Sequence, residues 1–91
     1  MVEIVDLISD LMLKIGDYVY SKSGLTEWLY VVIEVMVDKP NPYRGKIIWV
    51  KDKHHSRIFP VVGREATFRM DSSRINHRKL ENLDELMVEA L

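Results

Sequence analysis

The sequence has no cysteine and no long hydrophobic run. Without cysteine the chain has neither a disulfide framework nor a thiolate metal site. The apolar runs, such as Leu29–Ile33 and Leu11–Leu13, are far shorter than the ~20 residues of a transmembrane helix. The first residues include Glu3, Asp6 and Asp10 and lack the basic start of a secretory signal. We therefore expect a cytoplasmic protein with no membrane partner.

The motifs of common enzyme active sites are also missing. The only histidine pair is His54-His55, which would point to opposite faces of a strand and could share one metal only in a loop. No serine lies in a Gly-x-Ser-x-Gly context, and no glycine-rich phosphate loop is present. Acidic residues are abundant, but their spacing places no pair of them in one cleft. We expect a protein without catalytic activity, metal or other cofactor.

What the sequence does contain is a series of short strand patterns. Apolar and polar residues alternate in segments bounded by turn residues, which predicts strands over 15–22, 27–37, 45–53, 58–62 and 64–70. In 27–37 the odd positions are all aliphatic and are expected to face the core: Leu29, Val31, Ile33, Val35 and Val37. In 64–70 the residues expected to face inward are Ala66, Phe68 and Met70.

Helical patterns flank these strands. Apolar residues recur at the spacing of an amphipathic helix near the N-terminus, which predicts a helix over 1–14, with an extra strand as the alternative. Asn82 followed by Glu85 has the spacing of a helix cap and predicts a C-terminal helix over 82–91.

Together these elements define the expected fold. The chain of 91 residues is short enough for one domain. The fold class is mainly β (α+β), with four or five short strands over 15–76 and a short helix at each end. The strands would form either a small barrel or a bent antiparallel sheet.

Residues 15–19, Ile-Gly-Asp-Tyr-Val, resemble the opening of SH3-like barrels of the KOW and Tudor type, which often begin with Gly-Asp-x-Val. Lys22-Ser23-Gly24, Gly45-Lys46 and Ser73-Arg74-Ile75 follow in a compatible order over 15–76. The same layout is similar to that of short uncharacterised bacterial and phage proteins. The resemblance implies a barrel that binds nucleic acid, ribosomal or transcription components, or peptides, and that has no catalytic activity.

The formal net charge of −1 conceals a strong segregation of charge. Residues 1–38 have two basic and seven acidic side chains, a net charge of −5. Residues 39–79 have eleven basic and three acidic side chains, a net charge of +8. Residues 80–91 have four acids and no base. The middle of the chain is therefore the candidate surface for a polyanion.

Aromatic residues interleave this basic segment, which predicts a nucleic-acid-binding face. By alternation Trp49 points to the same side as Lys51 and Lys53, and a stacking ring beside ammonium groups suits a nucleic-acid strand. The expected binding residues are Lys46, Trp49, Lys51, Lys53, Arg57, Arg64 and Arg69. The alternative is that Trp49 is a core residue and that the basic residues pair with the acidic ends of the chain.

Four aromatic residues of the first two strands form the second candidate surface. Tyr18, Tyr20, Trp28 and Tyr30 are expected to share the side away from the core. They would either stabilise the sheet beneath a terminal helix or form a protein interface. The second functional hypothesis is therefore a protein-interaction adaptor, such as a phage or plasmid factor that acts on a host protein. A homodimer through the terminal helices is a variant of it.

Overall fold

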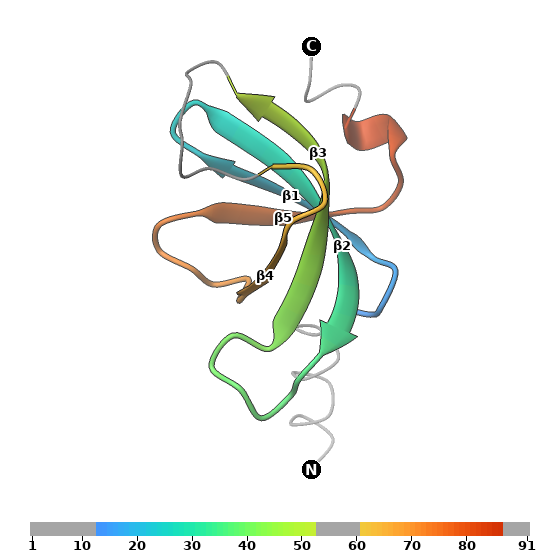
Figure 1. Cartoon of the computed structure of the whole chain (residues 1–91), viewed down its shortest axis with the longest axis vertical. Helices are drawn as coiled ribbons and strands as arrows, with labels where there is room; N and C mark the ends of the chain where they lie inside the picture. Colours follow the sequence, from blue (N-terminus) through green and yellow to red (C-terminus); the bar gives the residue numbers. More distant parts are fainter. Residues whose placement is uncertain (1–12, 53–60, 87–91) are drawn as a thin grey trace.

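A computed structural model describes residues 13–52 and 61–86 (Figure 1). Within these residues five strands form one sheet: β1 (Tyr18–Ser23), β2 (Thr26–Val35), β3 (Tyr43–Asp52), β4 (Glu65–Phe68) and β5 (Asn76–Leu80). Their order across the sheet is β4-β3-β2-β1-β5, and all neighbouring strands are antiparallel. The first four strands form a meander, and β5 then returns to pair with β1.

A two-residue turn joins β1 to β2. Ser23 pairs with Thr26, so only Gly24 and Leu25 lie between the strands. Gly24 has a φ of 62°, which suits the first loop position of a type II′ turn, where glycine is favoured. The turn sets the register of the hairpin, in which Tyr20 lies opposite Leu29.

The main core lies on one side of the sheet, which we call the inner face. Its buried residues are Leu13, Val19, Trp28, Tyr30, Val32, Tyr43, Ile47 and Phe68. The rings of Tyr30 and Phe68 are stacked with their centroids 4.5 Å apart, and the Phe68 centroid lies 4.9 Å from that of His77. Phe68 and His77 belong to opposite edges of the sheet, so the sheet bends strongly around these rings.

Gly45 in β3 makes the aromatic stack possible. A Cβ atom at this position would lie 2.8 Å from Cδ1 of Tyr30 and 3.0 Å from Cε1 of Phe68. Real Cβ atoms essentially never come closer than 3.0 Å to another heavy atom, so the Tyr30 ring would have to shift. Glycine is therefore required here by the close approach of the rings to the backbone.

A smaller cluster covers the opposite side of the sheet, the outer face. Tyr20, Leu29 and Leu80 are buried there. Tyr18, Trp49 and Leu86 pack against them and remain partly exposed. The central strand β2 is thus covered on both sides.

Two irregularities in the pairing of β2 with β3 change the alternation of side chains. Leu29 pairs with Trp49 and Tyr30 with Ile47, which leaves Ile48 as an extra residue in β3. Val32 pairs with Gly45 and Glu34 with Arg44, which leaves Ile33 as an extra residue in β2. Each bulge reverses the phase of the residues that follow it.

The prediction that the odd positions of β2 form the core face is therefore wrong. The largest core residues of β2 are at even positions, Trp28, Tyr30 and Val32. Leu29 belongs to the outer cluster, and Val37 is 69% exposed beyond the strand. Val35 does pack against the inner core, because the bulge at Ile33 returns it to that side.

The mainly β fold class is confirmed, and the bent antiparallel sheet is the correct one of the two architectures. A closed barrel was the other expectation, and it is wrong, because β4 and β5 are the two ends of the strand order and are not hydrogen-bonded neighbours. The inward placement of Phe68, with Ala66 and Met70 half-buried beside it, is confirmed.

Other predicted elements differ in extent or lie outside the described residues. Residues 61–62 are not in a strand, and 58–60 lie outside the described part. Of the helix expected over 1–14, residues 1–12 also lie outside it, and residues 13–14 are not helical. The C-terminal helix is seen only as one turn over 84–86, and residues 87–91 are not described. The strand β5 was not anticipated. In the described ranges no helix is long and apolar enough to cross a membrane.

Candidate nucleic-acid interface

Antiparallel pairing arranges the outer-face side chains in rows across the sheet. One row consists of Arg78, Tyr20, Leu29 and Trp49, contributed by β5, β1, β2 and β3. The guanidinium carbon of Arg78 lies 5.9 Å from the centre of the Tyr20 ring, within cation–π range. The neighbouring row consists of Asn76, Lys22, Glu27 and Lys51. The outer face therefore combines aromatic rings with cations.

Glu27 is a buried acid in the middle of the second row. Only 7% of its surface is exposed, and the hydroxyl of Tyr20 donates a short hydrogen bond to its Oε1. Lys22 and Lys51 are its cross-strand neighbours. Because opposite charges face each other across the strands, this row is electrostatically favourable. The acid lies below the surface, whereas Lys22 is exposed and Lys51 partly exposed.

The bulge at Ile48 brings three predicted binding residues to the outer face. Trp49 and Lys51 share this face by simple alternation. Lys46 is three residues before Trp49 and would point the opposite way in a regular strand. Because Ile48 is an extra residue, Lys46 instead lies opposite Val31 on the outer face. One strand thus presents a lysine on each side of a partly exposed tryptophan.

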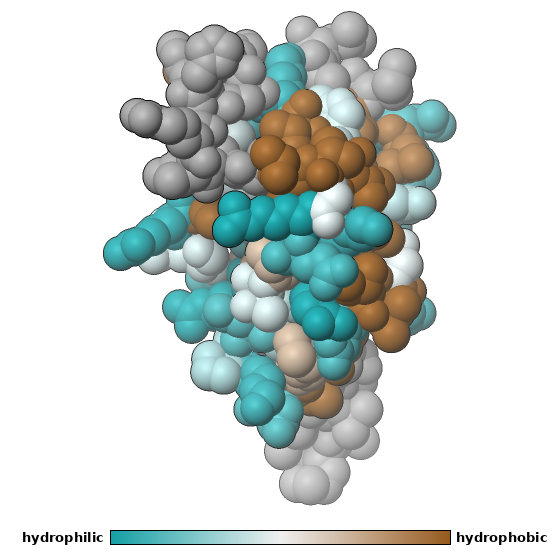
Figure 2. Space-filling view, viewed as in Figure 1, coloured by the Kyte–Doolittle hydropathy of each residue, from teal (hydrophilic) through white to brown (hydrophobic). Residues whose placement is uncertain are grey.

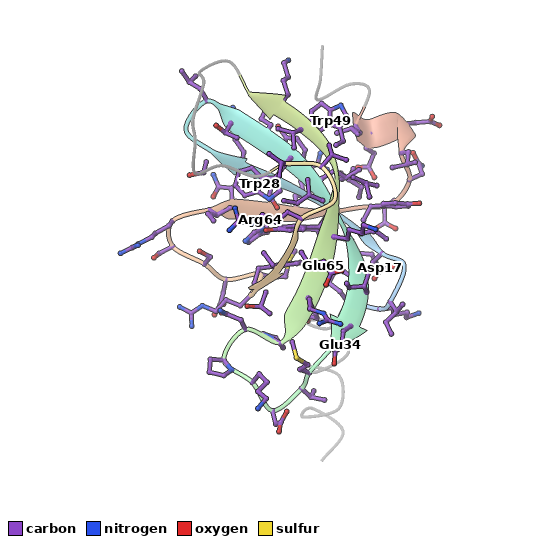
Figure 3. The ribbon with its side chains drawn as sticks, in the orientation of Figure 1. Asp17, Trp28, Glu34, Trp49, Arg64 and Glu65 are labelled. Carbon is purple, nitrogen blue, oxygen red and sulfur yellow. The ribbon has the colours of Figure 1, made fainter. Side chains whose placement is uncertain are left out.

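The arginine next to these residues is already paired. Nη2 of Arg44 lies 3.0 Å from Oε1 of Glu34, and Nε lies 3.8 Å from Oε1 of Glu65. Both acids are labelled in Figure 3, one on β2 and one on β4. The two carboxylates exceed the single charge of Arg44, and Glu65 also lies opposite Lys46 in the register, so the lysines of β3 on this face are Lys46 and Lys51.

The other predicted cations are not part of this group. Arg64 follows Gly63, whose N–H donates to the carbonyl of Ile47. The charge of Arg64 acts on Tyr30, which is a residue of the inner face. Burial is the main cause that raises the pKa of Tyr30, and the charge of Arg64 opposes it. Arg69 lies in the β4–β5 loop and pairs with Asp71 at 3.4 Å. Lys53 and Arg57 lie outside the described residues.

The expected aromatic patch is also divided. Tyr18 lies opposite Val31 and Tyr20 opposite Leu29, so these two tyrosines share the outer face. Trp28 and Tyr30 are on the inner face, with 4% and 5% of their surfaces exposed. The expectation of one shared surface is wrong. In the observed register the even-numbered residues of β1 lie opposite the odd-numbered residues of β2, so the even-numbered residues of the two strands face opposite sides of the sheet. The T-shaped contact of Trp28 with Tyr30 is a core contact.

Sequence reasoning missed Lys22 and Arg78 as members of the outer face. The alternation of β1 places Lys22 on the side of Tyr18 and Tyr20, which is a signal that the sequence carries. Arg78 depends on the pairing of β5 with β1, for which the sequence gives no signal.

His77 is partly buried and packs beside the aromatic residues of the inner face. Its Nδ1 lies 2.7 Å from Oγ of the fully buried Ser21, and its ring contacts Phe68. Burial lowers the pKa of His77 to about 4, so the ring is neutral at pH 7. Among the described residues no three His, Asp or Glu side chains are grouped to hold a metal ion. His54 and His55 lie outside that part.

Two apolar features lie elsewhere on the surface. The turn before β4 exposes Val61 and Val62 by 59% and 63%, and it crosses the sheet where Figure 2 shows an apolar patch in the upper half of the view. A groove of about 390 Å³ opens between the β2–β3 and β4–β5 loops. Its lining residues include Pro40, Pro42 and Met70, with Lys39 and Arg69 among the charged ones.

Neither the models of protein families, nor the curated proteins, nor the solved structures compared with this chain show a match to it.

Proposed function

We propose that this protein is a non-enzymatic binding module that acts in the cytoplasm and contacts single-stranded nucleic acid, RNA or DNA, through its outer face. The observation that carries the proposal is the grouping of Lys46, Trp49 and Lys51 on one side of β3. An indole ring offers a stacking surface to a base, and the flanking ammonium groups suit the phosphates on either side. Lys22 extends the cationic surface onto β1.

The electrostatics of the outer face support a polyanion. The acid that lies among these cations, Glu27, is buried and accepts a hydrogen bond from Tyr20. Glu34 and Glu65 both lie near Arg44, and Glu65 is also the cross-strand neighbour of Lys46. Lys22 and Lys46 are both exposed, and their positive potential raises the rate of encounter with a polyanion.

The proposed resemblance to SH3-like barrels of the KOW and Tudor type fits the same picture. The five strands form one strongly bent sheet, which brings side chains of the two edge strands into contact. The bulge in β3, which sets the composition of the proposed site, is a common feature of such curved sheets.

The experiment that tests the function is a titration of fluorescent single-stranded oligonucleotides at two salt concentrations. We expect binding that weakens steeply with salt, because phosphate contacts release counterions. Replacing Lys46 by Gln should reduce the salt slope by about 0.7, the value for one phosphate contact of a single strand. Replacing Trp49 by Ala should weaken binding by about 1–3 kcal/mol, the usual contribution of one stacked base.

The matched control is Lys39→Gln. Lys39 is also an exposed lysine, but it lies in the β2–β3 loop beside the groove and not on the outer face. It should retain the affinity and the salt slope of the native protein. Absence of binding at low salt, or equal losses for Lys39→Gln and Lys46→Gln, would contradict the proposal. Circular dichroism of Trp49→Ala is needed as well, because Trp49 also packs against the outer cluster.

A protein-interaction module is the second candidate function, and the groove beside Met70 is the observation that favours it. Its lining combines two prolines and a methionine with Lys39 and Arg69, which suits an apolar peptide that carries an acid. A Met70→Glu variant should lose a protein partner and keep oligonucleotide binding. Loss of a partner through Trp49→Ala alone would place the interface on the outer face instead.

A further inference from the structure

The segment after β5 packs against the outer face, where the nucleic acid would bind. It contains one helical turn over 84–86, and Leu86 packs against the cluster formed by Tyr20, Leu29 and Leu80. Trp49 packs against the same cluster and lies next to this turn in Figure 3. The turn therefore covers part of the surface that the proposed function assigns to a nucleotide base.

The same turn places a carboxylate on a cation of the outer face. Oε1 of Glu85 accepts a hydrogen bond from Nη1 of Arg78 at 3.1 Å. Arg78 in turn lies over the Tyr20 ring, in the row that ends at Trp49. A carboxylate at this guanidinium occupies the position that a phosphate would take.

The carboxylate of Glu85 is held in place by its own turn. Its Oε2 accepts hydrogen bonds from the backbone N–H groups of Glu81 and, at 3.3 Å, of Asn82. Oδ1 of Asn82 accepts from the N–H of Asp84 at 2.9 Å, so the start of the turn is capped from both directions. The bond from the Glu81 backbone, and then Arg78, lowers the pKa of Glu85 and favours its charged form.

We propose that the C-terminal turn is an internal competitor for the nucleic-acid-binding face, in which Glu85 takes the place of a phosphate and Leu86 that of a base. The inference rests on the proposed function and adds regulation to it. The turn also bears Asp84 and follows Glu81, so the competitor resembles the ligand in charge. Binding of a nucleic acid then requires this segment to be displaced, and the native affinity is lower than the outer face alone would give.

The test compares oligonucleotide binding by the full chain and by Glu85→Gln. Loss of the carboxylate removes a negative charge that competes with phosphate at Arg78, so affinity should rise several-fold at low salt and the salt slope should steepen by about 0.7. The matched control is Asp38→Asn, which removes one charge from an exposed loop residue. The small change in oligonucleotide affinity that we expect for this variant measures the effect of net charge alone.

The outcomes separate this inference from the function on which it rests. If the native protein binds, if Lys46→Gln weakens it, and if Glu85→Gln matches Asp38→Asn, the function stands and the competitor is wrong. If neither the native protein nor Glu85→Gln binds, both proposals fail. Greater tightening by Glu85→Gln than by Asp38→Asn supports the competitor.

A second measurement needs no ligand. Acrylamide quenching of tryptophan fluorescence reports mainly on Trp49, because Trp28 is only 4% exposed. Removing the apolar contact with Leu86→Ser should increase quenching and tighten oligonucleotide binding together. Unchanged quenching would show that the turn does not cover Trp49, and would overturn the inference.

Discussion

The ring of Phe68 in β4 lies 4.9 Å from the ring of His77 in β5, although these strands are the two edges of the sheet. The contact is made by side chains, because the two strands are not hydrogen-bonded neighbours. Tyr30 from the central strand β2 stacks on Phe68 and completes the group. The bend of the sheet is thus held by three rings from three strands, and substitutions here should affect the whole fold.

Gly45→Ala should destabilise the protein by about 1–3 kcal/mol, the usual effect of adding a methyl group to a filled core. The new Cβ would lie within 3.0 Å of both the Tyr30 and the Phe68 ring. Urea unfolding measures the change. Combining it with Phe68→Leu provides the control, since a smaller side chain should reduce the effect of the added methyl. Strict additivity of the two substitutions would contradict a direct clash.

Stability should decrease as pH falls from 6.5 toward 4, because of His77. The folded protein holds this ring neutral with a pKa of about 4, whereas the unfolded chain takes up a proton near pH 6.5. Between these values the unfolded state binds more protons, so acid favours unfolding. The slope is less than about 1.4 kcal/mol per pH unit, the limit for one proton, since the ring is only partly buried.

The variant His77→Gln isolates this effect. The native protein should lose more stability between pH 7 and pH 5 than this variant does. The loss that remains in the variant comes from the other titratable groups, mainly the carboxylates. Urea titrations at the two pH values measure both differences. Equal pH dependence in the two proteins would show that His77 is not responsible.

Tyr20→Phe should destabilise the protein by about 1–3 kcal/mol, because it removes a hydrogen-bond donor from a buried carboxylate. That carboxylate belongs to Glu27, which is 7% exposed. The matched variant is Tyr18→Phe on the same strand and face, where the residue is half-buried. Its effect should stay within about 0.5 kcal/mol. Similar losses for both would refute a special role of the Tyr20 hydroxyl.

Arg44→Ala should change stability by no more than about 1 kcal/mol, even though Arg44 is close to two acids. All three side chains are nearly half exposed, at 44% for Arg44 and Glu34 and 48% for Glu65, so water screens the pairs. Added salt should reduce the difference further. Thermal unfolding at low and high salt checks this, and a large salt-independent loss would be the contrary result.

The sequence predicted four of the five strands because their alternation is clear. It did not predict β5, since Asn76 to Lys79 are all polar and only Leu80 is apolar and buried. That strand is specified by its pairing with β1 and by the contacts of His77, which are tertiary. The core face of β2 was misassigned because apolar side chains occupy both of its faces, so period alone does not separate them.

The candidate site was predictable only in part. Alternation alone places Trp49 and Lys51 together. Arg64 and Arg69 lie apart from Trp49 and Lys51 because of the path that the chain takes after β3. The positions of basic residues in the sequence do not reveal that path. Charge segregation indicated a basic surface, but pairing between strands decides which bases share it.

The bulge at Ile48 makes the length of β3 as important as its composition. Removing this one residue would restore regular alternation, so that either Lys46 or Trp49 would have to cross to the other side of the sheet. If the first half of the strand turned over, Tyr43 and Ile47 would leave the core and Arg44 and Lys46 would enter it. A deletion at Ile48 therefore moves every side chain in one half of β3 to the opposite face of the sheet. Variants of this chain should accept many residue types at that position far more readily than the loss of the position itself.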